Sequence, residues 1–180
     1  MLQITVPSGE LFDERKGEFV TSEERTLQLE HSLVSLSKWE SKWKKPFMSR
    51  QEMTYEETVD YIRCMTITQN VNPNTYLFLT NDNINRVKEY INDSMTATWF
   101  PDDKRRTNNG REVTSELIYC WMITLNIPPD YQKWHLNRLL TLIKVCNAES
   151  QPKKRMSTRD IMRQNSSLNA QRRSRLKSKG

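Results

Sequence analysis

Glycine is scarce in this sequence, with four in 180 residues, and the four are far apart. Nucleotide-binding loops need clustered glycines where the backbone approaches a phosphate. No such cluster exists, so the sequence predicts no nucleotide cofactor. Paired carboxylates for acid–base catalysis are not indicated either. The carboxylates nearest the apolar segments stand at predicted helix starts, where they complement the helix dipole.

Histidine and cysteine are equally few: His31, His135, Cys64, Cys120 and Cys146. A zinc site would need several such ligands at short spacing, and none has it. The odd number of widely spaced cysteines argues against a disulfide framework and for a reducing compartment. A nucleophile pair of Cys120 or Cys146 with His135 would require a coincidence of folding. We therefore expect packed cysteines, His135 on a hydrogen-bonded helix surface, no catalytic or metal-binding residue, and no enzymatic activity.

Long apolar runs are also absent. No segment approaches the roughly 18 apolar residues that cross a bilayer, and the N-terminus lacks the basic and apolar regions of a signal peptide. We expect a cytosolic protein without a membrane partner.

Charge is distributed unevenly along the chain. Residues 148–180 contain ten basic and two acidic side chains, a net charge of +8, although the whole chain carries only +6. The composition thus predicts a nearly neutral folded body, residues 1–148, followed by a basic tail, residues 149–180.

The richest apolar stretch is Arg111–Asn147. Large apolar residues recur in both of its halves, at mostly three- and four-residue spacing in the second, which is typical of a helix. Pro128 and Pro129 separate the halves. Pro129, followed by an acidic residue, suits the first position of a second helix. We predict two antiparallel helices, with the rest of the chain packed against this helical hairpin.

The N-terminal third favours a small sheet and then helices. Leu2–Val6 and Thr26–Glu30 alternate as strands do, and a polar link containing Phe12, Phe19 and Val20 joins them. A helix is predicted from the N-cap Ser32 as far as Pro46.

Two more helices are expected in the middle of the chain. Thr54 and Glu57 form a capping box for one that continues to about Gln69, and Asn81–Ile91 has helical spacing with Asn81 or Asp82 as cap. Tyr76–Leu79 is apolar but of undecided type, Met95–Phe100 is β-prone, and Asp102–Arg111 is a polar loop. The fold class is therefore mostly α, built on the helical hairpin, with a small N-terminal antiparallel β-element.

The basic tail contains too few large apolar residues to bury a helix against the body. A helix start is indicated near Ser157, so we expect a segment that is disordered alone or helical on a partner. Basic residues without aromatic residues suit phosphate contacts, acidic proteins or plain solvation. A protein partner or none is favoured here over nucleic acid. The candidate partner-binding residues are Trp121, Trp134, Lys153, Lys154, Arg155, Arg172, Arg173 and Arg175.

Six stretches that are spread over most of the chain point to a known family. These stretches are Leu29–Trp43 (LEHSLVSLSKWESKW), Asp60–Val71 (DYIRCMTITQNV), Ser94–Thr98 (SMTAT), Glu112–Trp121 (EVTSELIYCW), Trp134–Cys146 (WHLNRLLTLIKVC) and Asn165–Gly180 (NSSLNAQRRSRLKSKG). They resemble the tail assembly chaperones of long-tailed bacteriophages.

The resemblance implies a non-enzymatic virion assembly factor in the host cytoplasm. Such proteins bind the tape measure protein, keep it soluble and help to bring tail tube subunits onto it. Many are made in two lengths by ribosomal frameshifting. The codons of Lys153 and Lys154 are a candidate slippery site. A gene sequence without a slippery heptamer at these codons would exclude it. The family has no catalytic residues to carry over. A homo-oligomer is an open alternative, as are a structural tail or head–tail component of the virion and a nucleic-acid-binding protein acting through the tail.

Overall fold

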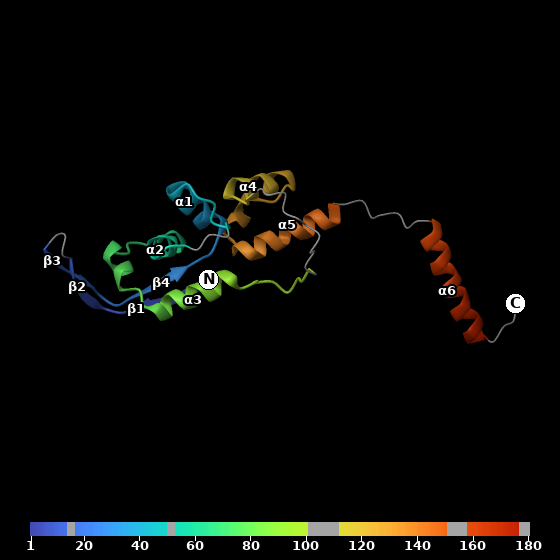
Figure 1. Cartoon of the computed structure of the whole chain (residues 1–180), viewed down its shortest axis with the longest axis horizontal. Coiled ribbons are helices and arrows are strands. Elements are labelled where there is room, and N and C mark those ends of the chain that lie inside the picture. The colour runs from blue at the N-terminus through green and yellow to red at the C-terminus, as the bar shows by residue number, and fades with distance from the viewer. Residues whose placement is uncertain (14–16, 50–52, 101–111, 151–157, 177–180) are drawn as a thin grey trace. The chain divides into compact units, whose positions relative to one another are not determined.

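The computed structural model describes residues 1–13, 17–49, 53–100, 112–150 and 158–176. The chain is mostly helical with a small N-terminal antiparallel sheet, as the sequence predicted (Figure 1). Contacts divide it into two units, Met1–Asn147 and Ala148–Gly180.

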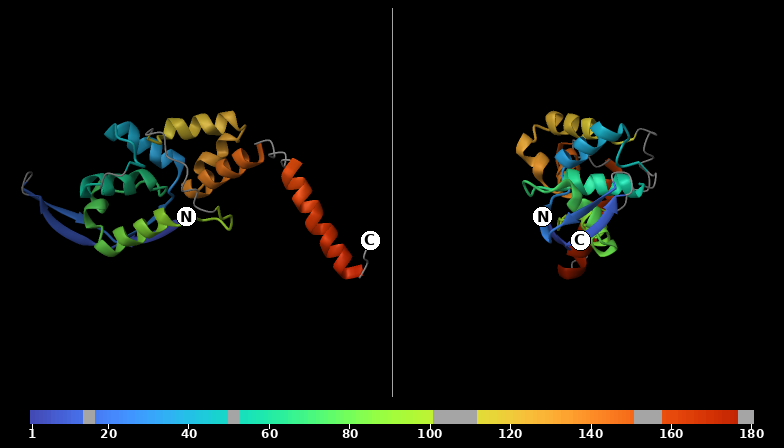
Figure 2. Two further views of the ribbon diagram at one scale, coloured as in Figure 1. Left: turned by 45° about the vertical axis from the view of Figure 1, so that its right-hand side comes forward. Right: turned by 90° about the vertical axis from the view of Figure 1, so that its left-hand side faces the viewer.

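The N-terminal strands form one long antiparallel ribbon. Strand β1 (Leu2–Val6) pairs with β4 (Arg25–Leu29), and β2 (Gly9–Asp13) pairs with β3 (Glu18–Ser22). The outer pair replaces the polar link predicted between the first and last strands. Pro7, which has no N–H to donate, stands where the two pairings are interrupted. Figure 2 shows the ribbon extending past the helices at its β2–β3 end.

Two helices start with the predicted caps. The hydroxyl of Ser32 accepts from the Ser35 N–H before α1 (Leu33–Trp43), and the hydroxyl of Thr54 accepts from the Glu57 N–H before α2 (Tyr55–Met65). Each satisfies a backbone donor that helix geometry leaves unpaired. Helix α2 ends four residues before the predicted Gln69.

The segment after α2 contains Tyr76–Leu79, whose secondary structure the sequence left undecided, and it corrects two predictions. Pro73–Phe78 forms the 3-10 helix η1, and α3 (Asn81–Asn92) is capped by Thr80 rather than by Asn81 or Asp82. Met95–Phe100 is not a strand. The predicted loop 102–111 lies outside the described residues.

The predicted helical hairpin contains an extra element. Helix α4 (Ser115–Thr124) is followed by the 3-10 helix η2 (Pro129–Lys133), and α5 begins only at Leu136 and runs to Ser150. Pro129 therefore starts η2 and not the second helix. Trp134 has extended backbone angles there, which place it between the two elements.

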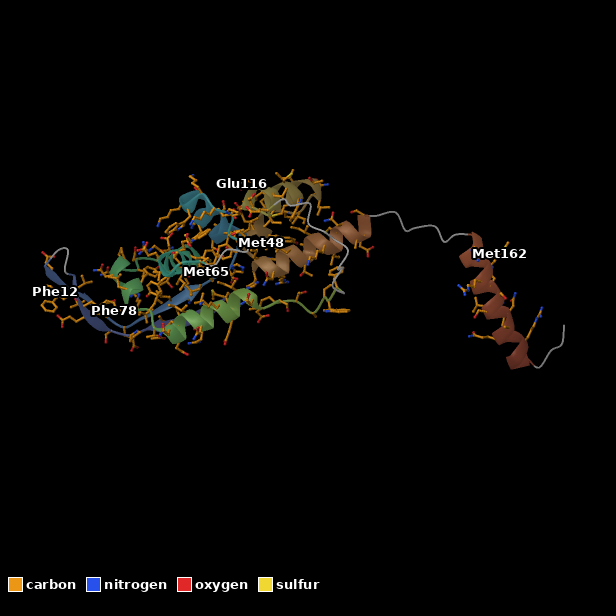
Figure 3. All side chains as sticks on the ribbon, viewed as in Figure 1. Phe12, Met48, Met65, Phe78, Glu116 and Met162 are labelled. Carbon is orange, nitrogen blue, oxygen red and sulfur yellow. The ribbon has the colours of Figure 1, made fainter. Side chains whose placement is uncertain are left out.

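Two apolar clusters make up the core of Met1–Asn147. The first cluster combines the ribbon with α2, η1 and α3, including Ile4, Leu27, Ile62 and Val87. The second cluster combines the helical hairpin with Leu33 and Leu36 of α1. The prediction that everything packs against the hairpin was thus wrong, because α2, α3 and the ribbon bury their apolar faces against one another. Figure 3 labels Met65, the last residue of α2, which is buried in the first cluster.

Residues Thr158–Leu176 of the basic tail form the helix α6. The sequence predicted disorder for this segment when the chain is alone, or a helix on a partner, and this stays a prediction. Every α6 side chain that the structure describes is exposed.

Candidate protein-binding surfaces

Trp134 is held in a stack at the junction of η2 and α5. Its ring lies parallel to that of Tyr131, with centroids 4.1 Å apart, and the Arg138 guanidinium lies 4.0 Å from its ring centroid. Cation–π and stacking contacts of this kind fix an indole while leaving part of it accessible. Trp121 is half-buried as well, packed against the second cluster. Both tryptophans therefore keep some exposed apolar surface.

The predicted basic residues fall into three groups. Lys153, Lys154 and Arg155 lie outside the described residues. Arg172 and Arg173 are exposed on α6. Arg175 is also in α6, where only its backbone is described.

A groove that the sequence did not reveal lies beneath the outer end of the ribbon. Its volume is about 570 Å³. Apolar or aromatic side chains from the ribbon, α1, α2 and η1 line it: Leu11, Trp43, Tyr55, Val59, Tyr76 and Leu77. Leu11, Tyr55 and Leu77 are 47%, 60% and 55% exposed, so this groove presents apolar surface to solvent. We call it the hairpin groove after the β2–β3 hairpin that covers it; the helical hairpin of α4 and α5 does not line it.

The ribbon is fixed over the hairpin groove by two close approaches to η1. The hydroxyl oxygens of Ser22 and Thr75 lie 3.1 Å apart, in a buried hydrogen bond. At Gly9 there is no room for a side chain, because a Cβ would stand 2.4 Å from Cδ1 of the Phe78 ring. Figure 3 shows Phe78 at this place and Phe12 farther out on the ribbon. The groove is therefore a built feature of the fold.

Three of the charged side chains along the hairpin groove, Lys42, Asp60 and Arg63, are paired with one another. Lys42 Nζ donates to Oδ1 of Asp60, and Trp43 Nε1 donates to Oδ2 at 2.9 Å. Burial would raise the pKa of Asp60, but these hydrogen bonds outweigh it and lower the pKa. The guanidinium of Arg63 covers the Tyr76 ring at 5.0 Å. Because these three charges are paired and most of the remaining lining is apolar or aromatic, the groove suits an apolar ligand surface better than a small polar substrate.

The two histidines meet in the interior, which corrects the predicted surface position of His135. Their ring centroids are 5.1 Å apart, and both side chains are buried. His31 Nδ1 lies 2.5 Å from the Tyr61 hydroxyl, and His135 Nε2 donates to the Tyr90 carbonyl at 3.0 Å. Nδ1 of His135 is buried without a hydrogen-bond partner. Sequence patterns could not reveal this pair, since its members are 104 positions apart.

Burial disfavours a charge on either histidine. It lowers the pKa of His31 from 6.5 to about 3, with the neighbouring His135 contributing. Burial also lowers the pKa of His135, against the opposing effect of its bond to the Tyr90 carbonyl. The pair is therefore neutral at pH 7. The pair lies where the first and second clusters meet. His31 contacts Tyr61 of the first cluster, and its carbonyl accepts from the N–H of Leu136, which belongs to the second cluster, at 2.7 Å.

The cysteines are not uniformly packed. Cys64 and Cys146 are half-buried, but Cys120 is exposed on α4, contrary to the prediction. Within the described ranges there is no group of three histidine, cysteine or acidic side chains that could hold a metal ion. No described helix is long and apolar enough to cross a bilayer.

The chain matches no protein-family model, no curated protein and no solved structure.

Proposed function

We propose that this chain is a non-enzymatic tail assembly chaperone of a long-tailed bacteriophage, acting in the host cytoplasm. It binds the tape measure protein and assists the assembly of tail tube subunits around it. The resemblance of six stretches to that family supports the proposal, and the hairpin groove supports it from the structural side.

The single structural observation that carries a binding role is the exposed apolar lining of the hairpin groove. Leu11, Tyr55 and Leu77 are about half exposed around one depression. Apolar surface that is exposed and contiguous is typical of a protein-interaction site. An amphipathic helix can place its apolar face in such a groove. A tape measure protein is a long helical client that must be kept from aggregating, so the surface and the client have matching chemistry.

Trp121 and Trp134 are candidate secondary contacts. Half-buried tryptophans combine a fixed orientation with exposed apolar area, which is typical of residues that anchor interfaces. A long client helix can contact more than one surface of a chaperone.

Co-expression tests the proposal. The chain is produced together with the large helical protein encoded downstream, and the lysate is examined by centrifugation and size-exclusion chromatography. The proposal predicts that the client moves into the soluble fraction and co-elutes with the chain. A client that stays insoluble while the chain elutes alone would refute it.

A further inference from the structure

Helix α6 is a strongly basic element that the proposed function does not use. Its 19 residues contain five arginines and one acidic residue, and no acidic residue follows Asp160 before the end of the chain. Arg159, Arg163, Arg172 and Arg173 are exposed. Apart from Asp160, every charged residue of α6 is an arginine, and these arginines lie towards its two ends.

The arginines are arranged along the helix. Successive residues turn by about 100°, which brings Arg159, Arg163 and Arg173 onto one face. The small residues Ser166 and Ala170 lie between them on that face. At about 1.5 Å per residue, the face extends roughly 21 Å from Arg159 to Arg173. A charged ligand can thus approach the helix backbone closely along four turns.

Among the side chains of α6 that the structure describes, the large apolar ones form no contiguous patch. The exposed large apolar residues Met162 and Leu168 are six positions apart, about 120° round the helix from each other. Protein interfaces are built around a contiguous apolar core from which charge is depleted. The helix has the opposite composition, and this favours a polyanion over an apolar protein surface.

We propose that α6 binds the phosphate backbone of a nucleic-acid duplex, without regard to base sequence. Guanidinium groups bind phosphate oxygens through paired hydrogen bonds. The serine and asparagine side chains of α6 can donate further hydrogen bonds to phosphate oxygens. The helix has no aromatic residue on which unpaired bases would stack, so a duplex is preferred to a single strand. This activity is independent of the hairpin groove.

Fluorescence anisotropy of the full chain with labelled 30-base-pair DNA and RNA duplexes tests the proposal. Neutralising four phosphates predicts a Kd that rises roughly 100-fold between 50 and 200 mM salt, since each phosphate contact contributes about 0.9 to the logarithmic slope. The variant R163Q/R173Q should weaken binding at least about tenfold at 50 mM salt. The variant K38Q/K144Q removes the same charge from exposed sites on Met1–Asn147 and should change Kd less than about twofold.

Two further measurements ask whether binding needs the helical arrangement of the charges and whether it needs phosphate. Ala170→Pro keeps every charge but breaks the helix, and it should weaken binding several-fold. Poly-glutamate at equal charge should compete at least about tenfold less effectively than unlabelled duplex. Equal competition by poly-glutamate would reassign α6 to acidic proteins and overturn the proposal, as would absent duplex binding or equal losses in the two double variants. DNA and RNA arms that differ in affinity identify which duplex is preferred.

Discussion

At the scale of single residues, Glu40 shows how one buried carboxylate joins distant segments. Its Oε1 accepts from the Phe47 N–H at 2.9 Å, and its Oε2 accepts from the Ser115 N–H at 2.7 Å. Ser115 is the first residue of α4, whose N-cap Thr114 makes no side-chain cap bond. Glu40 of α1 therefore supplies to α4 the acceptor that a capping side chain normally provides.

Glu40→Ala should lower the free energy of unfolding by about 2–4 kcal/mol, because two backbone donors lose a charged acceptor at a site only 7% exposed. Urea denaturation of the full chain measures this. Glu89→Ala, at an exposed position of α3, is the matched control and should change stability by less than about 0.5 kcal/mol. Similar values for the two variants would contradict the bridging role.

The histidine pair predicts a loss of stability in mild acid. The pKa of His31 is lowered to about 3 in the folded chain, so as the pH falls below 6.5 the unfolded chain takes up a proton first. The stabilisation is present above pH 6.5 and is lost as the pH falls towards 3, by at most about 1.4 kcal/mol per pH unit for one histidine. His135 acts in the same direction.

Urea denaturation between pH 6.5 and 5 measures this effect before the carboxylates Glu57 and Asp60, whose pKa values are also lowered, begin to contribute. His31→Gln removes the titrating group and keeps a hydrogen-bonding group near Tyr61, so its stability should fall less steeply with pH. A wild-type stability that is flat over this range would show that the histidines are not held neutral by burial.

Local residue patterns were sufficient to predict the caps Ser32 and Thr54, since capping depends on residues three positions apart. The contact between His31 and His135, and the Glu40 bridge to Ser115, depend on segments 75 or more residues apart. No periodicity within one segment contains that information.

At the scale of elements, the ribbon and η1 depend on one another. The close approach of Gly9 to Phe78 allows the outer strands to lie over η1. The sequence predicted β1 and β4 from their alternation, but β2 and β3 fall in the segment predicted as a polar link, because polar residues dominate it. Leu11, Phe12 and Phe19 of these two strands are exposed. Strand pairing along the ribbon, rather than burial, maintains these two strands.

Gly9→Ala should destabilise the chain by about 1–3 kcal/mol, because the added methyl group must displace the Phe78 ring. Thermal or urea unfolding measures the change, with Ser8→Ala at the adjacent exposed position as control. Adding Phe78→Val to Gly9→Ala removes the obstructing ring and should recover part of the loss. An unchanged stability in the single variant would mean that the ribbon does not rest on η1.

At the scale of the whole molecule, the sequence predicted the fold class, because it follows from summed composition and periodicity. It did not predict two clusters in place of one core. The helical hairpin is the most apolar stretch, yet the α2, α3 and ribbon segments each have a narrow apolar face that only another such face can bury. The hairpin groove was missed for the same reason, since it is made by four elements.

The measurement that tests the account most directly compares groove variants in co-expression with the tape measure protein. Leu11→Ser with Leu77→Ser removes exposed apolar surface from the hairpin groove, and Ile123→Ser removes it from a 76% exposed position of α4. All three side chains are exposed, so folding should be retained, as circular dichroism would verify. The account predicts that the groove variant loses the soluble complex while the Ile123 variant keeps it. A groove variant that still solubilises and co-elutes with the client would contradict the assignment of the hairpin groove as the client-binding site.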